Sequence, residues 1–196
     1  MPLGANKAAI FGVAGVSTGD VVLLSSQTAD DDASIAFESG ITSTYGEYIF
    51  KFYNMVPATD TAEFTFQANV ASQSGYNETM TTTYFRAYQK ESGLAYAVEY
   101  VDLDQAQGTA YQQMSQSLGN NPTDENLVGE LHLFNPASTT YVKHFHITTQ
   151  MNSSFEWTQN HFVAGYFNVT GAIDEVSFKM SSGNIKLGTI KMWGVK

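Results

Sequence analysis

The sequence predicts an all-β protein, an antiparallel β-sandwich of jelly-roll-like type with about ten strands. Apolar and polar residues alternate with a period of two in short segments along most of the chain, which is the pattern of strands that bury one face. Turn-forming residues separate these segments. The 196 residues are enough to bury one continuous core. We therefore expect a single sandwich domain over residues 19–196, preceded by an N-terminal arm, residues 1–18.

Eleven segments are expected to be strands. Two of them put three apolar residues each on one face, namely Tyr48, Phe50 and Phe52 in the first and Phe64, Phe66 and Ala68 in the second. The others are 21–24, 34–37, 80–88, 94–101, 127–134, 140–149, 162–169, 173–180 and 188–193. In the last segment, alternation places Ile190 and Met192 on one face and Lys191 and Trp193 on the other.

Three segments have the residues that tight turns require, and each is expected to join neighbouring strands. They are 56–60, 135–138 and 181–184, which are rich in Pro, Asn, Ser and Gly. Gly183 and Gly188 are expected to frame the last turn and the last strand.

Residues 104–118 interrupt the alternation. Ala106, Ala110, Met114 and Leu118 recur every four positions, a spacing that places them on one helical stripe. The segment contains Gly108 and many Gln and Ser residues, which favour a long polar loop instead. A short helix and a loop both remain open, and in either form the segment is a candidate for contact with a partner.

Composition excludes several classes of function. The chain has no cysteine, so disulfides and thiolate sites are absent. Its net charge is −10 with only nine Lys and Arg residues, which disfavours nucleic-acid binding because phosphates would be repelled. No apolar run approaches the roughly 20 residues that span a membrane. We expect neither nucleic acid nor membrane among its partners.

The first residues are expected to form a contact arm. The apolar stretch 8–14 imitates the core of a secretory signal but lacks a strongly basic leader. Small residues in this region suit an arm that becomes ordered by adding to the sheet of a neighbouring subunit. The candidate contact residues are Lys7, Ile10, Phe11 and Val13.

His144 and His146 are the strongest candidates for a metal site. Residues at i and i+2 of a strand share one face and so can share a metal ion. A metal site needs further ligands, and sequence cannot place His132 or His161 beside this pair. We therefore favour a surface or interface pair of histidines, with Lys143, Phe145 and Ile147 on the opposite face.

Carboxylates give no specific catalytic signal. Hydrolysis of a glycosidic bond requires two facing carboxyl groups, and any acidic sandwich offers candidates such as Glu47, Glu63, Glu99, Glu130 and Glu156. The run 30–32, three aspartates, lacks the spacing of a calcium loop and is expected to be an exposed acidic turn. The sequence has no nucleophile elbow, phosphate loop or metalloprotease motif. We expect no enzyme activity, cofactor or metal.

The C-terminal third contains four distinctive segments, LFNPASTTYVKHF (133–145), FVAGYF (162–167), FKMSSGNI (178–185) and GTIKMWGV (188–195). In these segments the chain resembles structural proteins of bacteriophage particles, especially those of marine and cyanobacterial phages. The resemblance covers about 127–196, and residues 104–126 do not match. It implies a virion β-sandwich without assigned catalytic residues, in which the matched segments build the core.

The resemblance implies a virion protein of either the head or the tail. The short chain, the lack of catalytic motifs and the small-residue arm lead us to expect a capsid decoration or cement protein on the outer surface of the virion. Its expected partners are the major capsid protein and further copies of itself, with a trimer as one arrangement. The alternative is a tail-fibre or receptor-binding module that recognises host polysaccharide, although the sequence lacks the heptads or shaft repeats of a fibre. A polysaccharide-degrading enzyme has only the generic carboxylates in its favour.

Overall fold

The computed structural model describes residues 20–93 and 95–196, which form twelve β-strands in two antiparallel sheets. The all-β antiparallel sandwich expected from the sequence is confirmed. The strands are β1 (Val21–Asp32), β2 (Ile35–Phe37), β3 (Glu47–Pro57), β4 (Phe64–Val70), β5 (Met80–Lys90), β6 (Tyr96–Tyr100), β7 (Gln112–Gln113), β8 (Leu127–Phe134), β9 (Lys143–Asn152), β10 (Trp157–Phe167), β11 (Ile173–Met180) and β12 (Ile185–Val195). These ranges contain no helix long and apolar enough to cross a membrane.

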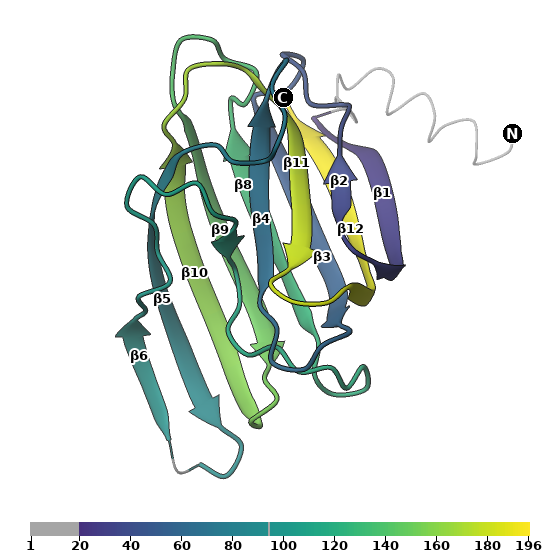
Figure 1. Cartoon of the computed structure of the whole chain (residues 1–196), viewed down its shortest axis with the longest axis vertical. Helices are drawn as coiled ribbons and strands as arrows, with labels where there is room; N and C mark the ends of the chain where they lie inside the picture. The colour runs from purple at the N-terminus through teal and green to yellow at the C-terminus, as the bar shows by residue number, and fades with distance from the viewer. Residues whose placement is uncertain (1–19, 94) are drawn as a thin grey trace, which may run out of the picture.

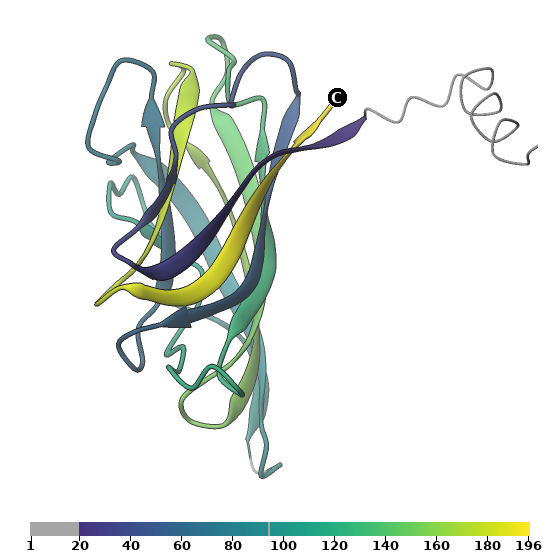
Figure 2. The ribbon, with the colours of Figure 1, turned by 90° about the vertical axis from the view of Figure 1, so that its right-hand side faces the viewer.

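The two sheets differ in size. The larger has eight strands in the order β1-β12-β3-β8-β9-β10-β5-β6, and the smaller has four in the order β2-β11-β4-β7. The smaller sheet lies against one face of the larger sheet (Figure 1). The hairpin of β5 and β6 extends past the smaller sheet at one end of the molecule, as both views show (Figures 1 and 2).

The core between the sheets is built around Phe178 of β11. Its ring lies 5.3 Å from Phe52 and 5.4 Å from Phe50 of the larger sheet, measured between ring centroids. Within the smaller sheet it stacks on Phe64 at 5.9 Å. The inward faces predicted for the two clearest segments are confirmed, because all six of those side chains are buried. Burying a phenylalanine contributes roughly 1.5–3 kcal/mol, so this cluster holds the two sheets together.

The alternative of a helix over residues 104–118 is wrong, and the segment is a loop that contains the two-residue strand β7. Its backbone groups bond to strands: Gly108 and Met80 exchange both N–H···O bonds, and the N–H of Met114 donates to the carbonyl of Phe64. Gln107 and Ser117 have φ angles of 55° and 56°, which no α-helix allows. Of the four residues in the expected stripe, Ala106 and Ala110 are exposed while Met114 and Leu118 are buried.

Buried amides fasten this loop to the sandwich. The side-chain amide of Gln67 on β4 donates to the carbonyls of Thr109 and Ala110, each at 3.2 Å. The amide of Gln112 donates to the carbonyl of Leu103 at 2.9 Å and accepts from the hydroxyl of Thr82 at 2.8 Å. The loop therefore covers β4, which is buried on both faces.

Candidate binding face

The eight-stranded sheet has one face that the four-stranded sheet does not cover, which we call the outer face. Alternation along the strands assigns residues to it, because their neighbours Phe50, Leu131 and Ile147 point into the core. The strand register places the outer-face residues in rows across the sheet. One row runs through Trp193, Ile49, His132, His146, Ala164 and Thr83, and the next through Lys191, Lys51, Glu130, Thr148, Phe162, Phe85 and Tyr100.

A cluster of histidines and carboxylates lies at the centre of the outer face. His132 of β8 is directly opposite His146 of β9, and their rings stack at 4.5 Å. The Nδ1 atom of His132 lies 2.5 Å from Glu47 and its Nε2 atom 3.3 Å from Glu130. Glu130 also pairs with Lys51 at 3.4 Å. A carboxylate therefore lies beside each ring nitrogen of His132.

The cluster shifts the pKa values of two of its members. Burial raises the pKa of Glu130, but the hydrogen bond and charge of His132, together with the charge of Lys51, outweigh burial and lower it. Burial lowers the pKa of His146, and the charge of His132 lowers it further. The two imidazoles are therefore stacked with His132 between two carboxylates, and protonation of His146 is disfavoured.

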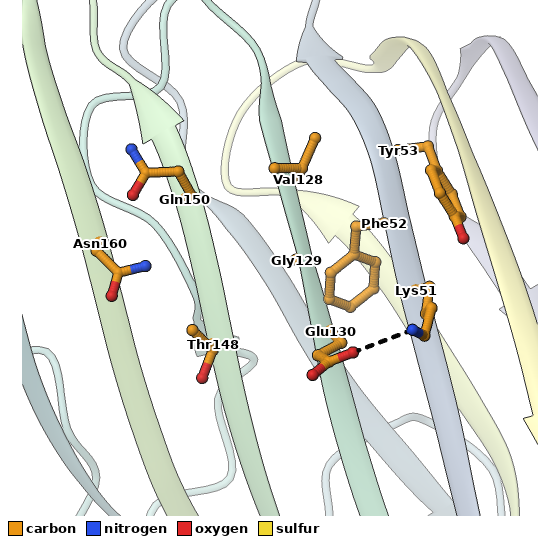
Figure 3. A pocket seen from close by; sticks show the side chains of 9 residues that line it. All are labelled: Lys51, Phe52, Tyr53, Val128, Gly129, Glu130, Thr148, Gln150 and Asn160. Carbon is orange, nitrogen blue, oxygen red and sulfur yellow. Dashed lines mark ion pairs between the residues drawn. The ribbon is translucent and has the colours of Figure 1, made fainter.

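A shallow hollow of about 450 Å³ lies beside this cluster (Figure 3). Its walls are amide, hydroxyl and ring side chains, with the Lys51–Glu130 ion pair at one end. Gly129 lies at its floor, where a Cβ atom would come within 2.4 Å of the Thr148 carbonyl oxygen. The other residues that line the hollow are Lys51, Phe52, Tyr53, Val128, Glu130, Thr148, Gln150 and Asn160.

The outer face becomes aromatic toward β6. Phe85 of β5 and Phe162 of β10 stack in parallel at 4.8 Å between ring centroids. Beyond them Tyr96, Val98 and Tyr100 of β6 are among the most exposed apolar side chains of the described residues. The face thus offers an aromatic end, a charged centre and a polar hollow, which together suit contact with a large partner.

The predicted pair, His144 and His146, shares one face of β9 as expected from the sequence. A third histidine, which the sequence could not place, lies beside His146. His144 and His146 are both exposed on the outer face, while Lys143, Phe145 and Ile147 point into the core. His132 joins the pair through the β8–β9 register, and His161 lies on the opposite face, fully buried against Tyr84. Among the described residues, no group of three or more histidine and carboxylate side chains is arranged to hold a metal ion.

The candidate carboxylates are scattered, apart from the two that meet at His132. Glu99 forms an ion pair with Arg86 at 2.7 Å, and Glu63 accepts a hydrogen bond from the Ser181 hydroxyl. Glu156 lies in the turn between β9 and β10. The three aspartates of 30–32 are exposed at the end of β1. The contact residues proposed for the arm, Lys7, Ile10, Phe11 and Val13, lie outside the described residues.

Comparison with known proteins identifies no family. Neither a protein-family model nor a curated protein matches this chain. Among solved structures, the chain is similar to A. japonicus CB05 with 13% identity over all of this chain and 29% of that one, at a TM-score of 0.26. It is also similar to the infectious bursal disease virus Gx strain with 11% identity over 89% of this chain and 40% of that one, at a TM-score of 0.18. The chain thus spans well under half of either structure's chain, and TM-scores this low carry no argument about function.

Proposed function

We propose that this protein is a structural protein of a bacteriophage particle that decorates the outer surface of the capsid shell. The observation that carries the proposal is the uncovered outer face of the eight-stranded sheet. This face is broad, carries exposed aromatic side chains at one end, and its hollows are shallow and open. Such a surface suits adhesion to a large partner better than enclosure of a small substrate, which ordinarily needs a deep cleft.

The resemblance to phage structural proteins supports the same proposal. Its four segments lie in β8 to β12 and contribute core residues to both sheets, including Leu133, Phe145, Phe167, Phe178 and Ile190. The four segments therefore supply core residues of the sandwich together with outer-face residues such as Phe162 and Trp193. The surfaces proposed to contact a partner are the outer face, the sheet edges and the arm.

The major capsid protein is the proposed partner of the N-terminal arm. The arm precedes Asp20, whose carbonyl accepts a hydrogen bond from the N–H of Lys196 at 3.0 Å. The next strand, β1, is the edge of the larger sheet and exposes Val21 and Leu23. An arm that leaves from this edge can add a strand to a neighbouring subunit while the sandwich remains folded.

Cryo-electron microscopy of the intact particle, joined to a binding assay, tests the proposal. Sandwich-shaped density on the capsid surface is the expected result, and density at the tail would contradict it. In the assay, deleting residues 1–15 should abolish binding to undecorated capsids without unfolding the sandwich. A matched control, Thr83→Ala on the outer face, should leave arm-mediated binding unchanged. Equal binding by the deletion variant and the full chain would rule out the arm as the anchor.

A second candidate function is recognition of host polysaccharide as part of a tail appendage. The hollow beside the histidine cluster favours it, because the Gln150 and Asn160 amides and the Thr148 hydroxyl are the groups that bond to sugar hydroxyls. Tyr53 supplies an exposed ring at the rim. This candidate predicts that the isolated protein binds host polysaccharide and that Tyr53→Ala or Asn160→Ala weakens binding about tenfold. The Thr83→Ala control should bind as the parent does.

A further inference from the structure

Strand β6 is an open edge of the larger sheet. It pairs with β5 on one side and is the last strand in the sheet order. Its three outer-face side chains are strongly exposed, at 76% for Tyr96, 75% for Val98 and 57% for Tyr100. An edge strand presents a row of backbone donors and acceptors that another strand can pair with. β6 contains neither lysine nor proline, two residues that commonly protect such an edge.

The hydrogen-bond pattern identifies which backbone groups of β6 face outward. The N–H of Lys90 donates to Ala95, and the N–H of Val101 donates to Tyr84. In an antiparallel pair these bonds alternate, so residues 95, 97, 99 and 101 direct their backbone groups toward β5. Tyr96, Val98 and Tyr100 therefore direct theirs away from the sheet, toward the open edge.

The sequence of β6 is self-complementary about Val98. In YAVEY (96–100), a two-fold axis through Val98 places Val98 opposite Val98 of a second copy and Tyr96 opposite its Tyr100. All three resulting pairs join residues whose backbone groups face outward, so this register uses every free group of the strand. Directly opposed aromatic and β-branched pairs stabilise antiparallel strands.

The charges of β6 do not oppose this pairing. Its one charged residue, Glu99, accepts hydrogen bonds from Nε and Nη2 of Arg86 at 2.9 and 2.7 Å. In the register centred on Val98, Glu99 is opposite Ala97 of the second copy, so no like charges meet. The other edge of the same sheet, β1, ends in three exposed aspartates, which would repel those of a second copy in an antiparallel register centred near that end.

We propose that two copies of this chain pair through β6 in an antiparallel, two-fold arrangement centred on Val98. The two larger sheets then form one continuous sheet, and both outer faces point to the same side because opposed residues share a face. This inference is independent of the proposed function, since it concerns the chain alone in solution. It assigns a dimer contact where the sequence led us to expect an oligomer with a trimer as one arrangement.

Disulfide trapping tests the register. The chain has no cysteine, so Val98→Cys introduces a single thiol. Opposed residues of a hydrogen-bonded pair have Cα atoms about 5.5 Å apart, within the range that a disulfide bridges. Under mild oxidation, Val98→Cys should cross-link at least about tenfold faster than Phe155→Cys, a control at an exposed turn residue. Equal rates for the two variants would overturn the proposal.

The mass in solution tests the contact independently. With rising concentration, the full chain should approach about 43 kDa, twice the 21.4 kDa of one chain, in sedimentation equilibrium. Val98→Lys places two ammonium groups opposite each other and should remain at about 21.4 kDa. Leu187→Lys, at an exposed residue of β12 far from β6 in the same sheet, should associate as the parent does. A parent chain that stays monomeric, or a Val98→Lys variant that associates normally, would overturn the proposal. Loss of association on deleting residues 1–15 would also overturn it, because the contact between the two copies would then lie in the arm and not in β6.

Discussion

At the residue scale, the most unusual group is the imidazole of His161. It is fully buried, its Nδ1 atom lies 2.8 Å from the Tyr84 hydroxyl, and its Nε2 atom has no hydrogen-bond partner among the described residues. Burial lowers the pKa of His161 to about 3, and the nearby charge of Arg86 adds to the effect. Burial also raises the pKa of Tyr84, so the pair is neutral at physiological pH.

This pair predicts a loss of stability in mild acid. Above the ordinary pKa of 6.5, His161 is neutral in both the folded and the unfolded state, so it does not reduce the free energy of unfolding. As the pH falls from there toward about 3, the unfolded chain binds a proton that the folded protein does not. The free energy of unfolding should therefore fall by about 2 kcal/mol between pH 7 and pH 5 on account of this residue.

Urea denaturation at the two pH values measures this loss. The double variant Tyr84→Phe, His161→Phe removes both polar groups together and should lose most of the pH dependence between pH 7 and pH 5. His144→Ala removes an exposed imidazole and should retain it. If the double variant is as acid-sensitive as the parent, another group is responsible.

The stacked histidines of the outer face give a second prediction at this scale. Part of the lowering of the pKa of His146 comes from the charge of His132. His132→Gln removes that charge, so the pKa of His146 should rise toward its ordinary value, as measured by NMR titration of the imidazole protons. Phe134→Leu changes a neighbouring ring without removing a charge and serves as the control. An unchanged pKa of His146 in His132→Gln would show that the charge of His132 does not contribute to the lowering.

The sequence predicted the face of these histidines but not their partners. The spacing of His144 and His146 alone fixes their common face, since alternation is a local property of a strand. Contact with His132 depends on the β8–β9 register, which the intervening turn determines. Lys143 was correctly placed on the inward face, yet nothing local indicated how its charge is accommodated. Its ammonium group donates to the carbonyls of Tyr141, Val169 and Thr170 at 2.6, 3.3 and 3.1 Å.

At the scale of the element, the sequence located strands well where one face is buried. Each of the eleven predicted segments overlaps a strand, but β1 and β12 extend further than predicted, to Asp32 and from Ile185. Backbone pairing between these two strands continues through polar residues, where alternation gives no signal. β7 was missed because two residues cannot show a period. The 104–118 loop was ambiguous because its contacts with β4 and β5 come from distant parts of the chain.

The predicted turns were located correctly, but only one of them joins paired strands. The 135–138 turn connects β8 and β9, which are neighbours in the larger sheet. The turns at 56–60 and 181–184 instead pass from one sheet to the other. Gly183 has a φ of 68°, as a tight turn at this position requires. Turn residues thus predict where the chain reverses, whereas the core determines which sheet the next strand joins.

Gly165 on β10 gives a prediction for the contact between strands. A Cβ atom at this position would lie 2.5 Å from the Thr81 carbonyl oxygen and 3.0 Å from the Thr82 Cα atom of β5. Both are backbone atoms that cannot move without separating the strands. Gly165→Ala should therefore lower the free energy of unfolding by about 2 kcal/mol or more. Ala164→Ser, at the exposed neighbouring position, should change it by less than about 0.5 kcal/mol in the same chemical denaturation experiment.

At the scale of the whole molecule, the two ends of the described chain are joined in one sheet. β12 lies between β1 and β3 and is antiparallel to both. Its inward residues Ile185, Ile190 and Met192 are buried in the core that both sheets share. The first strand, β1, is therefore attached to the rest of the larger sheet through the last strand, β12. Alternation in the sequence predicted the two faces of β12, but its central position follows only from the complete topology.

This arrangement predicts opposite outcomes for truncation at the two ends. Deleting 185–196 removes the partner of both β1 and β3 and exposes the core, so the product should not fold. Deleting residues 1–15 leaves every described strand and hydrogen bond in place and should preserve the cooperative thermal transition followed by circular dichroism. If the N-terminal deletion also abolished the transition, the boundary between arm and sandwich near residue 18 would be wrong. The arm would then be part of the domain. A loss of capsid binding by the deletion variant would in that case result from unfolding and not from the missing anchor.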